Sequence, residues 1–162
     1  MTRELAGALA VGLVAVVVIL IYLSNRSVRK AQETAIPKPA ASLNIEHPHS
    51  GYYVSTVFAQ KALTRVWAHG LGSRGKVFIG VDSQGVSLSR LGEVGFLIPA
   101  NQLIGLTKAS ATIDKAVERD GLLVLLWRLG EDELATHLRI VDRDKRKQLE
   151  AEITKATGVE IV

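Results

Sequence analysis

The chain has 162 residues, contains no cysteine and carries a formal net charge of +4 at pH 7. Because cysteine is absent, the chain has no disulfide framework and no thiolate that would bind a metal or act as a nucleophile. From Lys61 onward the basic residues are interspersed with acidic ones, which is typical of an ordinary mixed protein surface, so we expect no nucleic-acid partner.

The first predicted element is the apolar run Leu5–Leu23, which contains no charged residue and no proline. As an α-helix, this run would rise about 28 Å, close to the ~30 Å hydrocarbon core of a bilayer. We therefore expect residues 1–24 to cross the cell (plasma) membrane once as an N-terminal transmembrane anchor, which makes the lipid bilayer a partner of the chain. Ala8 and Gly12 form a small-xxx-small pair through which two anchors would pack as a homodimer.

A cleaved secretory signal is the alternative interpretation of this run. The apolar regions of signal peptides are shorter, about 7–15 residues, and end at a small-x-small cleavage site. Here the run continues to Tyr22 and Leu23 and is followed by Ser24, Asn25 and Arg26, without a nearby alanine-rich site. These features favour an anchor that is retained in the membrane.

The charges that flank the run predict its orientation. Arg26, Arg29 and Lys30 follow it, whereas Arg3 precedes it with Glu4 beside it. An excess of Lys and Arg close to the membrane marks the cytoplasmic side, so we expect the C-terminal domain in the cytoplasm. The three cations after the run would also face anionic lipid headgroups, and a simple stop-transfer flank is the alternative. The alternative is an envelope- or export-associated protein, with the domain outside the cytoplasmic membrane on an uncleaved signal anchor.

Residues 25–50 are expected to form a basic, proline-containing linker. Its first part would extend the anchor helix by a few turns, and Pro37 and Pro39 would then end the helix. An extended tether of this length would hold the following domain tens of ångströms from the bilayer. His47 and His49 lack further ligands nearby in the sequence, so we expect no metal site here.

From residue 51 onward the hydrophobic period changes to two, which predicts β-strands separated by glycine-containing turns. Residues 59–68 are less regular and suggest a short helix or a packed loop, and residues 114–121 suggest a polar loop. Residues 122–129 are apolar on both faces, as in a strand that is covered on both sides. The strands expected in chain order are Tyr52–Val57, Lys76–Val81, Val86–Arg90, Val94–Ile98, Asn101–Thr112, Leu122–Leu129 and Leu134–Ile140.

The segment 70–75 formally matches the G-x-G-x-x-G pattern of dinucleotide sites. That fingerprint requires a strand before the glycines and a helix after them, so that the helix N-terminus meets the pyrophosphate. Here the next segment, 76–81, is predicted to be a strand. We therefore reject a dinucleotide site and expect the glycines to occupy turn positions with positive φ.

The last predicted element is an amphipathic helix, Arg143–Ala156. Asp142 is a good N-cap residue, and Gly158 is a natural C-cap. Leu149 and Ile153 lie on one side of this helix. About seven antiparallel strands must close or pack face to face to hide their edges, so the pattern predicts a mainly β fold with one C-terminal α-helix that covers one end.

Four motifs extend this interpretation: WAHGLGSRG at 67–75, LIPANQLIG at 97–105, ATIDK at 111–115 and GLLVLLWRL at 121–129. With these motifs, the sequence resembles a bacterial family of single-span membrane proteins with a C-terminal PH-like (pleckstrin-homology-like) domain. The resemblance implies a PH-like seven-stranded barrel or sandwich over residues 51–162, capped by the helix and preceded by one N-terminal transmembrane helix. The family has no assigned activity, so the resemblance implies no catalytic residue and no cofactor.

The residues themselves show no nucleophilic constellation. His69 and His137 are far apart in the sequence, and neither has a hydroxyl or acidic partner at a recognisable spacing. We expect His137 to face solvent from its strand and His69 to order the glycine-rich loop through a backbone hydrogen bond. The chain is therefore expected not to be an enzyme.

Basic side chains supply the candidate binding residues. Eukaryotic PH domains often bind inositol phosphates through basic residues around the first hairpin, and the comparable region here offers Lys61, Arg65, Arg74 and Lys76. Arg and Lys suit phosphate because their hydrogen bonds are charge-assisted. Solvated surface charge is the alternative. We expect a membrane-anchored, non-catalytic adaptor that recruits a protein partner, for example along an open sheet edge, or contacts anionic lipid headgroups at the cytoplasmic face.

Overall fold

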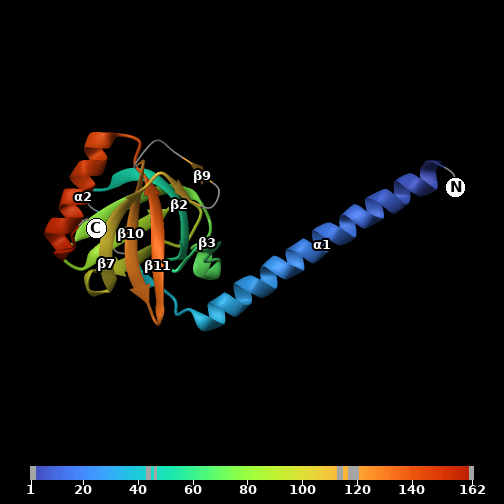
Figure 1. The fold of residues 1–162 in the computed structure, drawn as a ribbon, viewed down its shortest axis with the longest axis horizontal. Helices are drawn as coiled ribbons and strands as arrows, with labels where there is room; N and C mark the ends of the chain where they lie inside the picture. Colours follow the sequence, from blue (N-terminus) through green and yellow to red (C-terminus); the bar gives the residue numbers. More distant parts are fainter. Residues whose placement is uncertain (1–2, 43–44, 46, 113–114, 117–120, 161–162) are drawn as a thin grey trace.

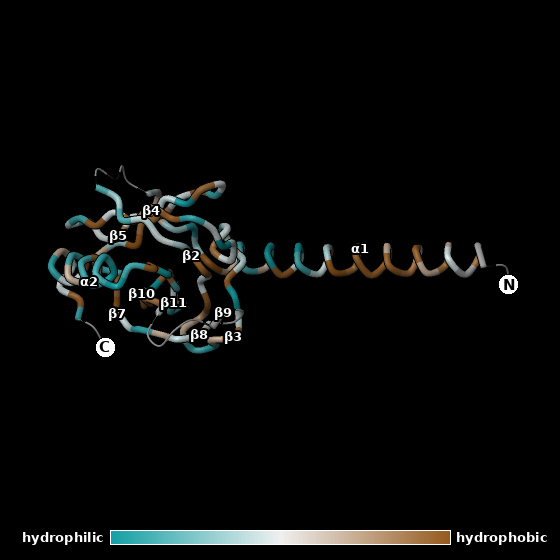
Figure 2. The backbone as a smooth tube through the Cα atoms, turned by 90° about the horizontal axis from the view of Figure 1, so that it is seen from above, coloured by the Kyte–Doolittle hydropathy of each residue, from teal (hydrophilic) through white to brown (hydrophobic). Residues whose placement is uncertain are grey.

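The computed structural model describes residues 3–42, 45, 47–112, 115–116 and 121–160. Helix α1, Arg3–Ala35, projects away from a domain of β-strands that is flanked by a second helix (Figure 1). The apolar part of α1 is exposed on all sides and forms the hydrophobic stretch of the tube in Figure 2. This helix is long and apolar enough to cross a membrane, which is compatible with a membrane anchor or a signal sequence.

The chain does not leave α1 as a free tether. The helix continues through the basic segment to Ala35 and ends just before Pro37, whose ring cannot continue a helix. Ile36 is buried, and strand β1, Ala40–Ala41, pairs with a strand of the main sheet. Residues 36–41, expected in an extended tether, therefore lie against the domain.

The main sheet has the strand order β1-β6-β5-β4-β2-β11-β10-β7, with β3 paired to β2, and its strand pairs are antiparallel. All seven predicted strands are present in the described part of the chain, followed by the helix, which confirms the predicted fold class. Strand β7 lies at the edge of the sheet, and part of its free edge is hydrogen-bonded to the C-terminal segment: the Leu106 N–H donates to the Glu160 carbonyl at 3.3 Å. The strands of this sheet after β1 are β2 His49–Phe58, β3 Lys61–Arg65, β4 Gly75–Asp82, β5 Gly85–Arg90, β6 Phe96–Pro99, β7 Leu103–Ala109, β10 Leu122–Leu129 and β11 Asp132–Arg139.

Three local predictions are wrong. Residues 59–68 do not form a short helix; they contain β3 and lead into the 3-10 turn η1, Ala68–Gly70. Residue Val94 is exposed and lies outside β6, because its carbonyl turns back toward the Arg90 guanidinium. The strand predicted up to residue 112 breaks after β7, and β8, Ala111–Thr112, pairs instead with β9, Lys115–Ala116. The rest of the polar loop predicted at 114–121, except Gly121, lies outside the described residues.

Aromatic side chains fill the centre of the domain. The ring of Phe96 stacks on Trp127, with 5.9 Å between the ring centroids, and meets the ring of Tyr53 edge-on at 6.2 Å. The buried polar atoms of this cluster are paired: the Trp127 indole donates to the Thr136 hydroxyl at 2.9 Å. The Tyr53 hydroxyl donates to the Leu71 carbonyl at 2.8 Å, and burial raises the pKa of Tyr53 to about 12.

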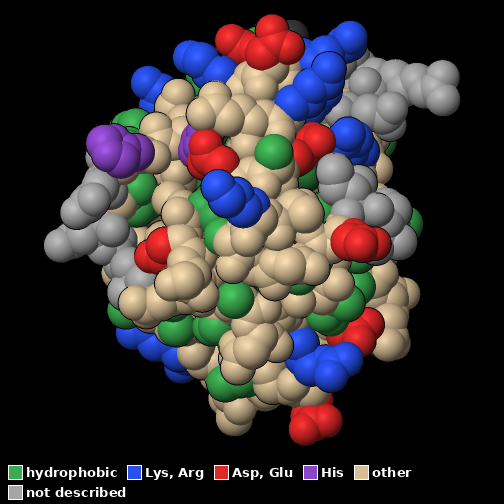
Figure 3. Space-filling model, turned by 90° about the vertical axis from the view of Figure 1, so that its left-hand side faces the viewer, with side chains coloured by type: hydrophobic (Ala, Val, Ile, Leu, Met, Phe, Trp, Pro, Cys, Tyr) green, Lys and Arg blue, Asp and Glu red, His purple; other side chains and the backbone are tan. Residues whose placement is uncertain are grey.

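Helix α2, Arg143–Thr157, covers one end of the sheet and confirms the predicted terminal helix. The Asp142 carboxylate accepts hydrogen bonds from the first turn, and Gly158 has the left-handed φ of 71° that a C-cap requires. Leu149 and Ile153 are fully buried against the core. On this side of the domain, away from α1, acidic and basic side chains are mixed (Figure 3).

Candidate site at the junction of helix and domain

Helix α1 is fastened to the domain by one side chain. The Gln32 side-chain carbonyl accepts hydrogen bonds from the backbone N–H groups of Trp67 at 2.6 Å and Ala68 at 3.3 Å. The Gln32 amide nitrogen donates in turn to the Arg65 carbonyl at 3.2 Å. A single glutamine therefore satisfies three backbone groups between β3 and η1, and this arrangement fixes the end of the helix to that loop.

A second contact lies one turn further along the chain. The Nε2 atom of His69 lies 2.9 Å from the Ile36 carbonyl oxygen, and the residue adopts the left-handed φ of 53°. This confirms the backbone hydrogen bond expected of His69, although its partner belongs to the segment after α1 and not to the glycine-rich loop itself. Of the glycines at 70, 72 and 75, Gly70 has the predicted positive φ, and the prediction is wrong for Gly72 and Gly75. Gly75 begins β4, and at Gly72 a Cβ would lie 2.6 Å from the Trp67 ring.

Arg90 holds the domain side of the junction in place. Its guanidinium is buried and donates to the Gly70 carbonyl at 2.7 Å and to the Val94 carbonyl at 2.8 Å. The same group lies 4.7 Å from the centroid of the Tyr53 ring. Arg90 thus ties η1 to the turn between β5 and β6 and braces both against the aromatic core.

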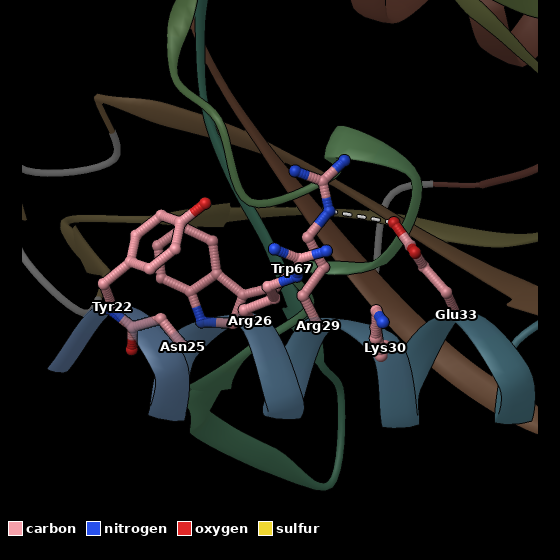
Figure 4. A pocket seen from close by; sticks show the side chains of 7 residues that line it. All are labelled: Tyr22, Asn25, Arg26, Arg29, Lys30, Glu33 and Trp67. Carbon is pink, nitrogen blue, oxygen red and sulfur yellow. Dashed lines mark hydrogen bonds and ion pairs between the residues drawn. The ribbon is translucent and has the colours of Figure 1, made fainter. Parts of the chain in front are cut away.

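A pocket of about 450 Å³ lies between α1 and this loop (Figure 4). The helix contributes three cations and one acid to it, and Arg29 pairs with Glu33 at 2.8 Å. Trp67 is 45% exposed and forms the domain wall, with its ring beside that of Tyr22 in Figure 4. The pocket is lined by Tyr22, Asn25, Arg26, Arg29, Lys30, Glu33 and Trp67.

The structure does not bring the four predicted headgroup residues into one pocket. Arg65 lies at the junction, where its guanidinium is 5.2 Å from the centroid of the Trp67 ring. Lys61 lines a separate hollow together with three acidic residues of the β10–β11 turn and β11. Lys76 lines another hollow near the start of α2, and Arg74 is exposed in the loop before β4.

The sequence interpretation does not group the helix face that lines the pocket with the loop opposite it. It assigns Arg26, Arg29 and Lys30 to the flank of the apolar run, where cations face anionic headgroups, and Trp67 to a family motif. The spacing of residues 22, 26, 29 and 33 places them on one face of a continuous helix, and this signal would have grouped them. The contacts of Gln32 have no comparable signal, because they reach backbone atoms more than thirty positions away.

Two further histidines, His49 and His137, make their contacts outside the junction. His137 is buried, which contradicts the expected exposure, and desolvation lowers its pKa. His49 contacts Glu152 of α2 at 2.6 Å, and this hydrogen bond lowers the pKa of the Glu152 carboxyl. Among the described residues, no group of three or more His, Cys, Asp or Glu side chains is placed to hold a metal ion.

Comparison with known proteins agrees with this geometry. An antiparallel sheet that ends in a C-terminal helix, preceded by a long apolar helix, defines a PH-like domain behind an N-terminal apolar segment. The family model described as bacterial PH domain-like matches residues 31–154. The chain therefore belongs to the bacterial PH domain-like family. The search of curated proteins finds no match to it.

Proposed function

We propose that the protein is a membrane-anchored, non-catalytic binding module that contacts anionic lipid headgroups at the cytoplasmic face of the cell membrane. The observation that carries this proposal is the junction pocket, where Arg26, Arg29 and Lys30 lie on one side and Trp67 lies on the other. PH-like domains are typically non-catalytic, and the chain matches the bacterial PH domain-like family over residues 31–154.

The height of the pocket along α1 supports a headgroup ligand. At 1.5 Å per residue, Arg26, Arg29 and Lys30 lie about 4.5, 9 and 10.5 Å beyond Leu23, the last residue of the apolar run. The polar layer on each side of a bilayer is roughly 5–8 Å thick, so Arg26 starts within it, and Arg29 and Lys30 start a few ångströms beyond its outer edge. Long basic side chains reach toward the interface, where lipid phosphates are found.

The chemistry of the lining also suits a lipid phosphate. Arginine donates charge-assisted hydrogen bonds in a planar fork that matches phosphate oxygens. Tyr22 and Trp67 are the aromatic residue types enriched at membrane–water interfaces. Of the four predicted headgroup residues, Arg65 adjoins this pocket through Trp67 and belongs to the proposed site. For Lys61, Arg74 and Lys76 we propose separate, additional contacts with anionic lipid headgroups.

The test compares lipid selection by two double variants of the full-length protein. Protein in nanodiscs that contain equal phosphatidylglycerol and phosphatidylcholine is purified, and the lipids in contact with it are quantified by native mass spectrometry. We expect enrichment of phosphatidylglycerol for the unmodified chain and loss of at least half of it for Arg26→Gln with Lys30→Gln. Lys147→Gln with Lys155→Gln removes the same charge from exposed positions on α2 and should leave the enrichment unchanged.

Two results would overturn the proposal. Equal enrichment in both double variants would show that the pocket does not select anionic lipid. Loss of enrichment in 10 mM inorganic phosphate at constant ionic strength would show a site for free phosphate instead of a headgroup. The orientation is tested separately with C-terminal fusions to reporters that are active on only one side of the membrane. We expect activity from the reporter that works in the cytoplasm. Activity only from the reporter that works outside would reverse the proposed side.

A further inference from the structure

We propose that the domain itself rests on the bilayer through three apolar side chains beside the anchor: Leu63, Leu91 and Val94. These residues, called the apolar tips below, are 84%, 71% and 69% exposed, and they are the most exposed large apolar side chains of the domain among the described residues. Single exposed apolar side chains are common, but a group of them on one side of a molecule marks an interaction site. The partner we assign is the surface of the membrane that α1 crosses.

The contacts of the junction bring the two segments that carry the tips close to the end of α1. Leu63 lies in β3, two residues before Arg65, whose carbonyl accepts a hydrogen bond from Gln32. In Figure 1, β3 lies on the side of the domain toward which the N-terminal part of α1 extends. Leu91 and Val94 belong to the turn that Arg90 ties to η1, and Glu93 of that turn attracts Arg29 of α1 electrostatically.

The joint leaves little room between the domain and the lipid. Gln32 lies about 14 Å beyond Leu23 along the helix axis at 1.5 Å per residue. Trp67 reaches back from this joint, because it lines the same pocket as Tyr22, which lies in the last turn of the apolar run. A side chain of the domain thus lies level with the end of the hydrocarbon core, and the loops around it lie level with the headgroups.

The position of the domain also favours lipid over a protein partner. The domain lies to one side of the helix axis, and membrane-spanning helices tilt by about 20° on average. If α1 tilts toward the side on which the domain lies, β3 and the β5–β6 turn approach the bilayer while the hydrogen bonds of Gln32 are kept. Lys61 and Arg65 flank Leu63 in β3, so basic side chains surround an apolar tip, as in peripheral membrane-binding surfaces.

The absence of cysteine makes this orientation directly measurable. Single variants Leu63→Cys, Leu91→Cys and Val94→Cys are labelled with an environment-sensitive fluorophore in the full-length protein, which is placed in nanodiscs that contain spin-labelled lipid. Val141→Cys is the matched control, because Val141 is 65% exposed but lies next to the start of α2. All four positions are exposed, so the variants should fold normally.

We expect spin-labelled lipid to quench the fluorophore at the three tips at least twofold and to leave position 141 unaffected. Equal accessibility to water at all four positions would overturn the inference and would leave a protein as the partner of this surface. The inference uses the proposed membrane anchor but not headgroup selection. Adding Arg26→Gln and Lys30→Gln separates the two, because quenching at the tips should persist when enrichment of anionic lipid is lost.

Discussion

The side-chain carbonyl of Gln32 accepts a hydrogen bond of 2.6 Å from the backbone N–H of Trp67, and this contact joins helix α1 to the domain. The joint replaces the extended tether that prolines at 37 and 39 suggested. Because Gln32 also binds the N–H of Ala68 and the carbonyl of Arg65, the connection restrains the direction of the helix as well as its distance.

The first prediction concerns this joint. Gln32→Ala removes the partners of three backbone groups, so we expect the loop around Trp67 to open more often. Hydrogen exchange of the Trp67 and Ala68 amides should accelerate at least tenfold, because loss of one or more net hydrogen bonds costs about 1 kcal/mol each. Gln148→Ala, on the exposed face of α2, should leave these amides unchanged. Equal protection in both variants would contradict the role of Gln32.

The second prediction concerns the core tyrosine. Tyr53→Phe removes the hydroxyl that donates to the Leu71 carbonyl and also contacts Thr56, and both groups are buried. We expect a loss of about 0.5–1.5 kcal/mol in the free energy of unfolding, because net hydrogen bonding is lost while both partners stay paired: the Leu71 carbonyl still accepts from the Thr56 N–H, and the Thr56 hydroxyl still contacts that of Thr136. Chemical denaturation of the full-length protein in detergent measures this loss. Tyr52→Phe alters a half-exposed neighbour and should cost less than ~0.5 kcal/mol; equal costs would refute the argument.

The third prediction follows from the lowered pKa of His137. Desolvation favours the neutral imidazole in the folded protein, and the ordinary pKa is about 6.5. Below pH 6.5 the unfolded chain therefore binds a proton that the folded chain resists, so stability falls as pH decreases from 6.5 toward the lower folded-state pKa. Val57 and Val124 lie in the apolar cluster beside His137, and the backbone groups of Ser55 and Ala135 act on its pKa in the opposite direction to desolvation.

The measurement compares unfolding between pH 7 and pH 5. His137→Gln should lessen the loss of stability over this interval, because glutamine does not titrate. His47→Gln replaces an exposed histidine and should keep the pH dependence of the unmodified chain. If the free energy of unfolding changes equally with pH in all three proteins, His137 does not cause the pH dependence.

Much of the fold was predictable because alternation marks a strand that is covered on one face. Val86 and Leu88 in β5 and Leu134 and Leu138 in β11 are fully buried as expected. The same rule misplaced Val94, which continues the alternation of β6 but belongs to a turn fixed by Arg90. Alternation describes which side chains prefer burial, and it does not show where a tertiary hydrogen bond ends the strand.

His137 shows a second limit of the pattern. Its neighbours in the sequence predict an outward side chain, and outward positions are polar in a sheet with one wet face. Here the outward face of β2, β10 and β11 carries its own small apolar cluster of Val57, Val124 and Ala135. Residue Thr112 of β8 reaches Ser55 of β2 at 3.4 Å, so the β8 segment lies over this face.

The junction pocket was only partly predictable. The basic residues after the apolar run are visible in the sequence, and their helical spacing places them together once α1 is known to continue to Ala35. The wall provided by Trp67 depends on a fold in which a loop thirty-five positions after Gln32 returns to the helix. Hydrogen bonds from a side chain to distant backbone atoms leave no pattern of residue types, so a sequence alone does not reveal them.

The short segments along the outermost strands affect how copies of the molecule meet. Ala40 and Ala41 occupy the free side of β6, and the Glu160 carbonyl bonds to Leu106 on β7. Unpaired border strands are templates for intermolecular pairing, which leads to aggregation. Because the chain itself bonds to part of each border strand, two copies of the molecule have fewer unpaired backbone groups through which their sheets would join.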